Sequence, residues 1–361
     1  MRVVRKAAAH EAVLEAAKSC PPADRQPDLD PFLSLVREDL TILESARALT
    51  TSTGRADYRS NWVLPAGQLG AEREERHCLF LCVNQKYFLS LLTFLCSFLG
   101  QAPQSQCRIF VFLDDDVPRH LYGTIAMVGA RFGRSIELVP EPDFVPREVE
   151  HREDYGFFAG GGSLARAAYF RLYAARWLLQ RHSFARAVYI DTDTVCRGDL
   201  SPMFELDLHG RLVAAATEDY SLDVIDAATR HGLDPREYFN SGVLVLPMDD
   251  PGLSPAIEAA IRVAEREQER LMFQDQCALN IAFRGKVSPL PSRFNFFLRP
   301  HRERNGFLED GLILHFVDKP KPWDIVFDRT YREEWRVWAL LLGSILPQSI
   351  YVDIFAAANR D

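Results

Sequence analysis

The sequence predicts an α/β protein in which a mostly parallel sheet is covered by helices on both faces. Short and fully apolar runs alternate with longer helix-like stretches, and several of these runs end in polar or acidic residues. In such sheets the functional side chains gather at the carboxyl ends of the strands. The expected strands are residues 78–83, 108–116, 135–140, 185–195, 211–217, 241–246 and 312–317, and the expected helices are residues 88–100, 164–180 and 254–270.

The first expected unit is a strand, a loop and a helix. The run CLFLCV is short and apolar throughout, as in a strand that is buried on both faces. NQKY follows as a loop, and FLSLLTFLCSFLG then ends in glycine, which commonly terminates helices. RIFVFLDDD, SIELVP and ARAVYIDTDTV are read as strands in the same way, with a helix LARAAYFRLYAARWLLQ before the last of them.

The chain is expected to have three parts. Residues 1–75 are predicted to be a helical extension and linker, with helices at residues 5–18 and 31–48 separated by the proline-rich CPPADRQPDLDP. The polar and turn-rich segment that ends in AEREER places the start of the main domain near Arg76. This main domain is expected to span residues 76–325, and residues 326–361 are expected to form a helical tail.

Composition limits the classes of function. The formal net charge of -8 and the pI near 5.7 argue against a general nucleic-acid binder. The odd number of cysteines, scattered through apolar surroundings, implies no disulfide framework. Charges interrupt the start of the chain, so no signal peptide is expected, and no apolar stretch is long enough to span a membrane. We expect a cytoplasmic protein, with peripheral contact at the inner face of the membrane left open.

Two carboxylates lie where a buried strand is expected to end. Asp191 and Asp193 close the run AVYIDTDTV, where they are flanked by Thr192 and Thr194. Their side chains can converge on one hard divalent cation, because carboxylate oxygens suit magnesium or manganese. The alternative is a turn with two solvated acids, since a single D-x-D pattern occurs by chance in many proteins.

A cationic loop follows the last expected strand. LILHFVDKPKPWD places His315 at the end of an apolar run, followed by Lys319, Lys321 and Trp323. This loop can supply an imidazole to a metal and an ammonium group to a phosphate, and a nucleoside diphosphate leaving group requires both. The alternative is an exposed basic loop that contains a hydrogen-bonded core histidine.

With these segments the chain resembles glycosyltransferase family 8, which includes glycogenin and bacterial lipopolysaccharide galactosyl- and glucosyltransferases. The resemblance spans about residues 79–323 and implies a GT-A fold, a Rossmann-like nucleotide-binding mixed sheet flanked by helices. It rests on ordered motifs rather than on the D-x-D alone. These motifs are YIDTDTV, YFNSGVLVL, FQDQCALN, SRFNF and HFVDKPKPW.

The resemblance implies roles for individual residues. Asp191, Asp193 and His315 would bind manganese, with magnesium as the alternative, and the metal would bridge the phosphates of a UDP-sugar. Lys321 would neutralise phosphate charge, and Thr192 would join the residues that bind the donor. The catalytic group around the donor sugar would consist of Asn240, Asp275, Gln276 and Arg171, with Ser163 opening the region of Arg171. A polar residue inside an apolar strand is costly unless it is paired, which independently favours a site role for Asn240.

The uridine site departs from the family pattern. Tyr87 resembles the tyrosine that stacks on uracil, but Asn84 stands where many relatives have an acid, and Lys86 stands where they have asparagine. The Asn84 amide can still accept from uracil N3–H and donate to a carbonyl. Asp318 replaces the usual glycine of the last motif, which adds negative charge and changes how closely the backbone can approach the phosphate.

The implied reaction is retaining transfer of galactose or glucose from a UDP-sugar to a saccharide, glycolipid or protein acceptor. An amide is a poor nucleophile, so Gln276 favours same-face substitution over double displacement. Asp275 and Glu218 are the nearest carboxylates for a supporting role, and Glu218 is expected either to hold the acceptor hydroxyl or to be a solvated loop acid.

Other functions remain open at this point. A metal-dependent nucleotidyltransferase would share the paired aspartates, but no glycine-rich loop follows the first strand. A glycoside hydrolase would not explain the lysine-rich loop. A degenerate GT-A domain that only binds nucleotide sugars is opposed by the intact D-x-D, histidine and lysine, and it is favoured by the departures at Asn84, Lys86 and Asp318.

The tail presents one apolar helical face. Trp335, Trp338, Leu342 and Ile345 recur at spacings of three and four. We expect this face to pack on the rest of the protein, while a homodimer contact or a weak membrane-surface contact remains an alternative.

Overall fold

The computed structural model describes residues 76–102, 106–145, 164–267, 270–299, 311–324 and 329–359. The chain divides into two units, residues 1–68 and 69–361, and all described residues belong to the second unit. The helices predicted at residues 5–18 and 31–48 lie outside the described residues, as does Ser163.

A seven-stranded mixed sheet forms the centre of the described unit, with strand order β3-β2-β1-β4-β7-β6-β8. Every strand pair in it is parallel except the two pairs that involve β7. This arrangement confirms the predicted α/β class. The strands are β1 (His77–Val83), β2 (Arg108–Leu113), β3 (Glu137–Pro140), β4 (Arg186–Ile190), β6 (Val213–Thr217), β7 (Phe239–Pro247) and β8 (Val287–Pro289).

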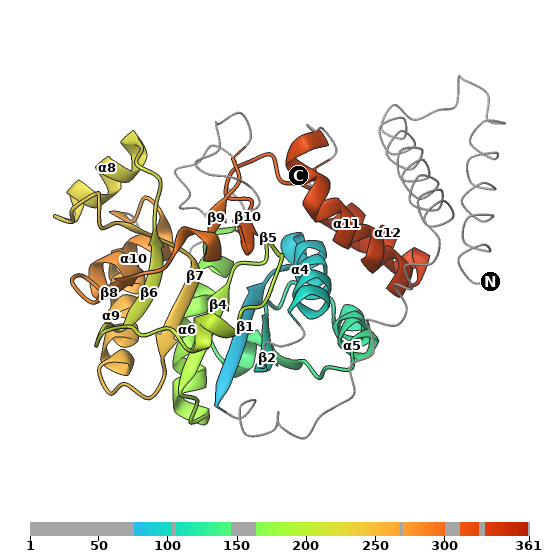
Figure 1. The fold of residues 1–361 in the computed structure, drawn as a ribbon, viewed down its shortest axis with the longest axis horizontal. Helices are drawn as coiled ribbons and strands as arrows, with labels where there is room; N and C mark the ends of the chain where they lie inside the picture. Colours follow the sequence, from blue (N-terminus) through green and yellow to red (C-terminus); the bar gives the residue numbers. More distant parts are fainter. Residues whose placement is uncertain are drawn as a thin grey trace. The chain divides into compact units, whose positions relative to one another are not determined.

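Helices cover both faces of this sheet, as Figure 1 shows. One layer consists of α4 (Phe88–Gln101), α5 (Tyr122–Arg131), α11 (Arg329–Ile345) and α12 (Gln348–Ala358), and the other of α6 (Leu164–Arg181), α9 (Leu253–Arg266) and α10 (Gln274–Ala282). Two shorter helices are α7 (Ser201–Phe204) and α8 (Leu222–Arg230). Along β1, Leu79 and Leu81 belong to the core beneath α4, and Phe80 and Cys82 to the core beneath α6. Alternate side chains of the strand therefore enter opposite cores, which explains why the whole run is apolar.

The reversed strand β7 brings two motifs together. In its antiparallel pairing with β4, Ile190 lies opposite Val243, and the Asp191 backbone N–H donates to Gly242 O at 2.7 Å. The start of β7 therefore lies beside the end of β4. This pairing places Asn240, near the beginning of its strand, at the same edge as the aspartates that follow β4.

A small second sheet joins the D-x-D segment to the cationic loop. Its strands are β5 (Thr194–Cys196), β10 (Ile313–His315) and β9 (Phe296–Phe297), in the order β5-β10-β9. The expected strand at residues 185–195 is thus two strands, with Asp191 and Asp193 in the turn between them. His315 pairs with Thr194 across the antiparallel β5–β10 ladder. Backbone pairing alone therefore places the histidine next to the aspartates.

The C-terminal tail packs on the α4 side of the domain. Trp335, Trp338 and Leu342 are buried on α11, which lies against α4, α5 and β5. The contact with α4 is close, since a Cβ added at Gly100 would lie 2.9 Å from the Trp338 ring. The apolar face expected from the sequence is thus core of the described unit. No helix in the described part of the chain is long and apolar enough to cross a membrane.

Candidate active site

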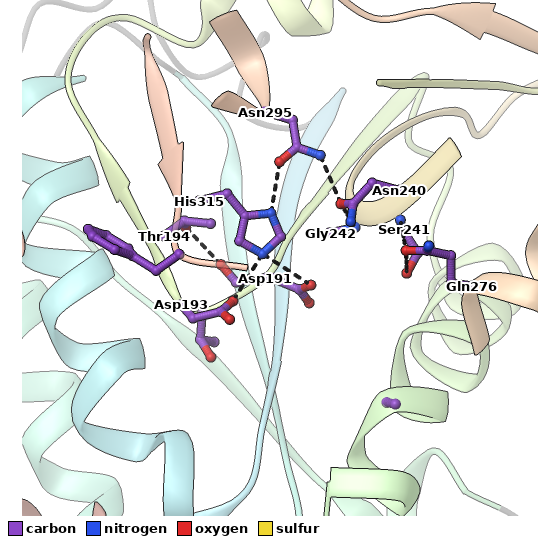
Figure 2. Close-up of polar contacts among 12 residues, drawn as sticks. Asp191, Asp193, Thr194, Asn240, Ser241, Gly242, Gln276, Asn295 and His315 are labelled. Atoms are coloured by element: carbon purple, nitrogen blue, oxygen red, sulfur yellow. Dashed lines mark hydrogen bonds and ion pairs between the residues drawn. The ribbon is translucent and has the colours of Figure 1, made fainter. Parts of the chain in front are cut away.

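Three potential metal ligands converge where the two sheets meet. Asp191 and Asp193 follow β4 and His315 ends β10, and one ligand atom from each lies within 4.8 Å of the others. His315 Nε2 is 3.3 Å from Asp193 Oδ1 and 3.9 Å from Asp191 Oδ2. Figure 2 marks both contacts with dashed lines. Two carboxylates and an imidazole form a donor set that could hold a divalent metal ion.

A chain of side-chain amides fixes the orientation of His315. Asn240 Nδ2 donates to Glu218 Oε2 at 2.8 Å. Asn295 Nδ2 donates to Asn240 Oδ1 (2.9 Å), and His315 Nδ1 lies 2.8 Å from Asn295 Oδ1; Figure 2 draws these last two contacts. Because the Asn295 oxygen can only accept, His315 Nδ1 carries the proton. The Nε2 lone pair then faces the two aspartates, which is the arrangement of a metal-binding histidine held by a hydrogen-bonding partner.

Gly242 makes room for this cluster. A Cβ at this position would lie 2.3 Å from His315 Cε1, 2.8 Å from Asp191 Oδ2 and 2.9 Å from Asn240 Oδ1. Any side chain on Gly242 would therefore displace the ligands or their support. The glycine of the FNSGV segment allows β7 to approach the donor set closely.

Lys321 contributes a buried positive charge next to the aspartates. Its Nζ donates to Asp193 Oδ2 at 2.7 Å and to Phe316 O at 2.6 Å. Burial raises the pKa of Asp193, but its contacts with neighbouring groups, of which the Lys321 ammonium has the largest effect, outweigh burial and hold that pKa well below its usual range. Asp193 is therefore a carboxylate at neutral pH, ready to bind a cation.

Arg171 links the aspartates to the second candidate cluster. Its guanidinium lies 3.0 Å from Asp191 Oδ1 and 3.1 Å from Asp275 Oδ2, and Nη1 donates to Ser241 O at 2.7 Å. The side chain is buried on α6 and lies over the Tyr189 ring, 4.6 Å from its centroid. Arg171 therefore neutralises two acids of the protein, and its contact with the donor stays a prediction.

Asp275 and Gln276 enter the site from the start of α10. The preceding residue, Gln274, has a φ of 45°, a left-handed conformation that few residues other than glycine adopt. Burial raises the pKa of Asp275 to about 6, even though Arg171 and the Ser241 hydroxyl favour the carboxylate. The Gln276 amide is engaged at both ends, because Oε1 accepts from Ser241 N (3.0 Å) and Nε2 donates to Glu218 Oε2 (3.3 Å).

The residues expected at the uracil site gather around the turn after β1. Tyr87 meets the Trp323 ring edge to face at 5.5 Å between centroids, which joins this turn to the last motif. Asn84 is buried and its side-chain oxygen accepts from Tyr87 N (3.1 Å), so it caps the 3-10 helix Gln85–Tyr87 that carries Lys86. Thr192 is buried, and its carbonyl accepts from Ser90 Oγ at 2.6 Å.

Several residues of the site received no role from the sequence. Asn295 and Ser241 lie inside quoted motifs, SRFNF and YFNSGVLVL, so motif membership could have indicated them. The Tyr189 hydroxyl donates to Asp191 Oδ1 at 2.5 Å, and Tyr189 precedes this aspartate by two residues. Arg299 also reaches Glu218, and nothing in its sequence neighbourhood indicates this contact.

Comparison with known proteins relates this chain to sugar transferases. Residues 78–325 match the family model described as Glycosyl transferase family 8. Lipopolysaccharide 1,2-glucosyltransferase of Escherichia coli (strain K12) is 30% identical over 171 residues, covering 44% of this chain and 49% of that protein. Glycosyltransferase GlyE of Streptococcus pneumoniae is 28% identical over 171 residues, covering 45% and 39%. The chain therefore spans about half the length, or less, of these curated relatives.

Solved structures share the fold. The crystal structure of the galactosyltransferase LgtC in complex with donor and acceptor sugar analogs superposes with a TM-score of 0.55 at 21% identity, covering 76% of this chain and 98% of that one. The crystal structure of GlyE superposes with a TM-score of 0.54 at 21% identity, covering 78% and 64%. At this level of identity the likeness establishes the architecture.

Proposed function

Because the chain belongs to glycosyl transferase family 8, we propose that it transfers galactose or glucose from a UDP-sugar to a hydroxyl group of a saccharide, glycolipid or protein acceptor. The family match and the mixed sheet confirm the resemblance and the fold expected from the sequence motifs. The choice of hexose is supported by two similar proteins, which are named a glucosyltransferase and a galactosyltransferase. Within the chain, residues 76–325 would form the catalytic domain, between the extension at residues 1–75 and the tail at residues 326–361.

The observation that carries this proposal is the oriented donor set. Asp191, Asp193 and His315 would hold Mn2+ or Mg2+, and the fit is supported by the proton on His315 Nδ1, which leaves Nε2 free to bind. Such an ion supplies Lewis-acid neutralisation of the diphosphate charge. The close approach at Gly242 also supports the fit, because it leaves no space for a side chain beside the ligands.

Lys321 would stabilise the departing UDP. It is the buried ammonium group of the last motif, and its contact with Asp193 holds it beside the proposed metal ligands. A positive charge fixed in advance at this position stabilises a phosphate leaving group more as negative charge develops on it. Arg171 would act indirectly, because its contacts with Asp191 and Asp275 keep both carboxylates oriented and partly neutralise their charge.

We propose retention by same-face substitution. The Gln276 oxygen accepts a backbone hydrogen bond from Ser241, and its nitrogen donates to Glu218. An amide held at both ends is suited to positioning rather than to nucleophilic attack. Asn240 and Gln276 would orient the sugar and the attacking hydroxyl together with Glu218, whose carboxylate touches both amides.

The test is a UDP-release assay with UDP-glucose and UDP-galactose, in Mn2+, in Mg2+ and after chelation. Asp193→Asn keeps the shape of the side chain but removes the ligand charge, so we expect activity to fall by about 100-fold or more while the protein remains folded by circular dichroism. NMR of the product should show the anomeric configuration of the donor. Full activity in a metal-free preparation, or an inverted product, would contradict the proposal.

A further inference from the structure

Arg299 binds three carboxylates that come from two separate segments. Its Nε lies 2.7 Å from Asp219 Oδ2, its Nη2 lies 2.9 Å from Glu218 Oε1, and its Nη1 lies 2.5 Å from Asp318 Oδ1. A guanidinium carries five donors in a rigid fork, so three acids can be held at once in fixed directions. Arg299 therefore ties the segment after β6 to the segment after β10.

One end of this contact reaches the reaction centre. Glu218 is only 9% exposed, and its second oxygen accepts from Asn240 Nδ2 (2.8 Å) and Gln276 Nε2 (3.3 Å). Asn240 continues through Asn295 to His315, as Figure 2 shows. The Glu218 carboxylate thus helps to hold both amides in place, and Arg299 helps to hold that carboxylate.

The other end reaches residues 316–321, which we call the closing loop. Asp318 lies midway between His315 and Lys321, whose Nζ contacts Asp193 at 2.7 Å. A lone carboxylate in this loop would repel a diphosphate. Its pairing with Arg299 cancels this charge and at the same time anchors the loop. Arg299 remains charged, because Asp219, Asp318 and Glu218 together raise its pKa against the opposing effect of burial.

We propose that Arg299 is a positioning residue for the transfer reaction and that Asp318 is the latch through which it holds the closing loop in place for a nucleoside diphosphate. This inference rests on the proposed function. Asp318, which departs from the usual glycine of the last motif, then has a positive role: it forms an ion pair with Arg299, and we call this pair the clasp. Through Asp318 the clasp holds the loop that carries Lys321, and through Arg299 it holds the carboxylate of Glu218.

The first test is Asp318→Asn, which removes the charge at a residue whose side chain is 39% exposed and therefore tolerant of change. Calorimetry with UDP and Mn2+ should show about fivefold weaker binding, as expected for loss of one partly exposed ion pair, and donor KM should rise similarly with little change in kcat. Asp318→Glu should restore most of the affinity. Asp226→Asn is the matched control, because it removes an exposed acid that pairs only locally, 2.7 Å from Arg230 on α8, and should leave UDP binding unchanged.

The second test is a double-mutant cycle with Arg299→Met. This variant should weaken UDP binding and also lower kcat, because Glu218 loses the partner that orients it. Adding Asp318→Asn to Arg299→Met should cause no further loss. Wild-type affinity in Asp318→Asn, or losses that simply add in the double variant, would overturn the clasp.

The clasp and the proposed function fail in different ways. A wild-type protein that binds UDP but transfers no sugar would refute the transferase proposal, and the binding cycle would still decide the clasp. A wild-type protein that does not bind UDP in the presence of Mn2+ would refute both.

Discussion

Replacing Gly242 by alanine places a methyl group inside the candidate metal site. The new Cβ would lie 2.3 Å from His315 Cε1 and 2.8 Å from Asp191 Oδ2, well inside the roughly 3.5–4 Å at which carbon atoms pack. His315 cannot move away without losing its hydrogen bond to Asn295. We therefore expect a loss of about 1–3 kcal/mol in the free energy of unfolding from overpacking. Affinity for Mn2+ should fall about 10–100-fold, as when a ligand loses its support.

Gly123→Ala is the matched control for this prediction. Gly123 lies in α5, and a Cβ there would meet no atom within 4 Å, so the same substitution should leave stability unchanged or raise it by about 0.5–1 kcal/mol. Urea unfolding followed by circular dichroism measures the first effect, and calorimetry of Mn2+ in the presence of UDP measures the second. A Gly242→Ala protein that matches wild type in stability, metal affinity and UDP release would refute the close approach between β7 and the ligands.

Two further predictions concern buried charges. Lys321→Ala should lower kcat by about 100-fold and change donor KM less, because the ammonium group is needed most as UDP departs. Lys319→Ala, which removes an exposed lysine from the same loop, should change neither constant, and equal effects of the two substitutions in steady-state kinetics would reassign Lys321. For Asp275, the raised folded-state pKa of about 6 means that stability is fully present below the unfolded pKa near 3.8 and is lost as pH rises through 6. Asp275→Asn should remove about 2 kcal/mol of this pH dependence between pH 4 and pH 7. A free energy of unfolding, measured with urea, that depends on pH as strongly as that of wild type would count against the shift.

The sequence predicted those strands whose side chains are apolar along their whole length. The runs at residues 78–83 and 241–246 are continuous apolar strands because both faces of the sheet are covered, and β1 and β7 follow them closely. The strand expected at residues 185–195 was too long, since the chain turns at Asp191 and crosses into the second sheet. The hydrophobic periodicity and the polarity of the sequence do not reveal this crossing, because β5 is as buried as β4.

The residues of the candidate site that belong to recognisable motifs were predicted, whereas contacts that depend on how distant segments pair in the fold were missed. Asp191, Asp193 and His315 were indicated by their residue types at the ends of apolar runs, and Lys321 by the cationic loop that follows His315. The structure brings these four side chains together. The antiparallel direction of β7 was not predicted. A strand that is buried on both faces is apolar along its whole length, so its sequence does not show whether it runs parallel or antiparallel to its neighbours. The antiparallel direction explains why Asn240, at the start of its strand, can support a histidine at the end of another.

The departure at Asp318 shows why residue-by-residue comparison with a family can mislead. Judged by itself, a carboxylate in place of glycine adds repulsion where a diphosphate is expected to bind. Arg299, which neutralises it, is separated from it by 19 positions, and Glu218 and Asp219 are a further 80 positions or so away. No pattern within one segment connects these four residues, because the ends of β6, β9 and β10 meet only after the two sheets have formed. The chemical meaning of the substitution therefore depends on the fold: with Arg299 in place, the closing loop has an anchor that glycine cannot provide.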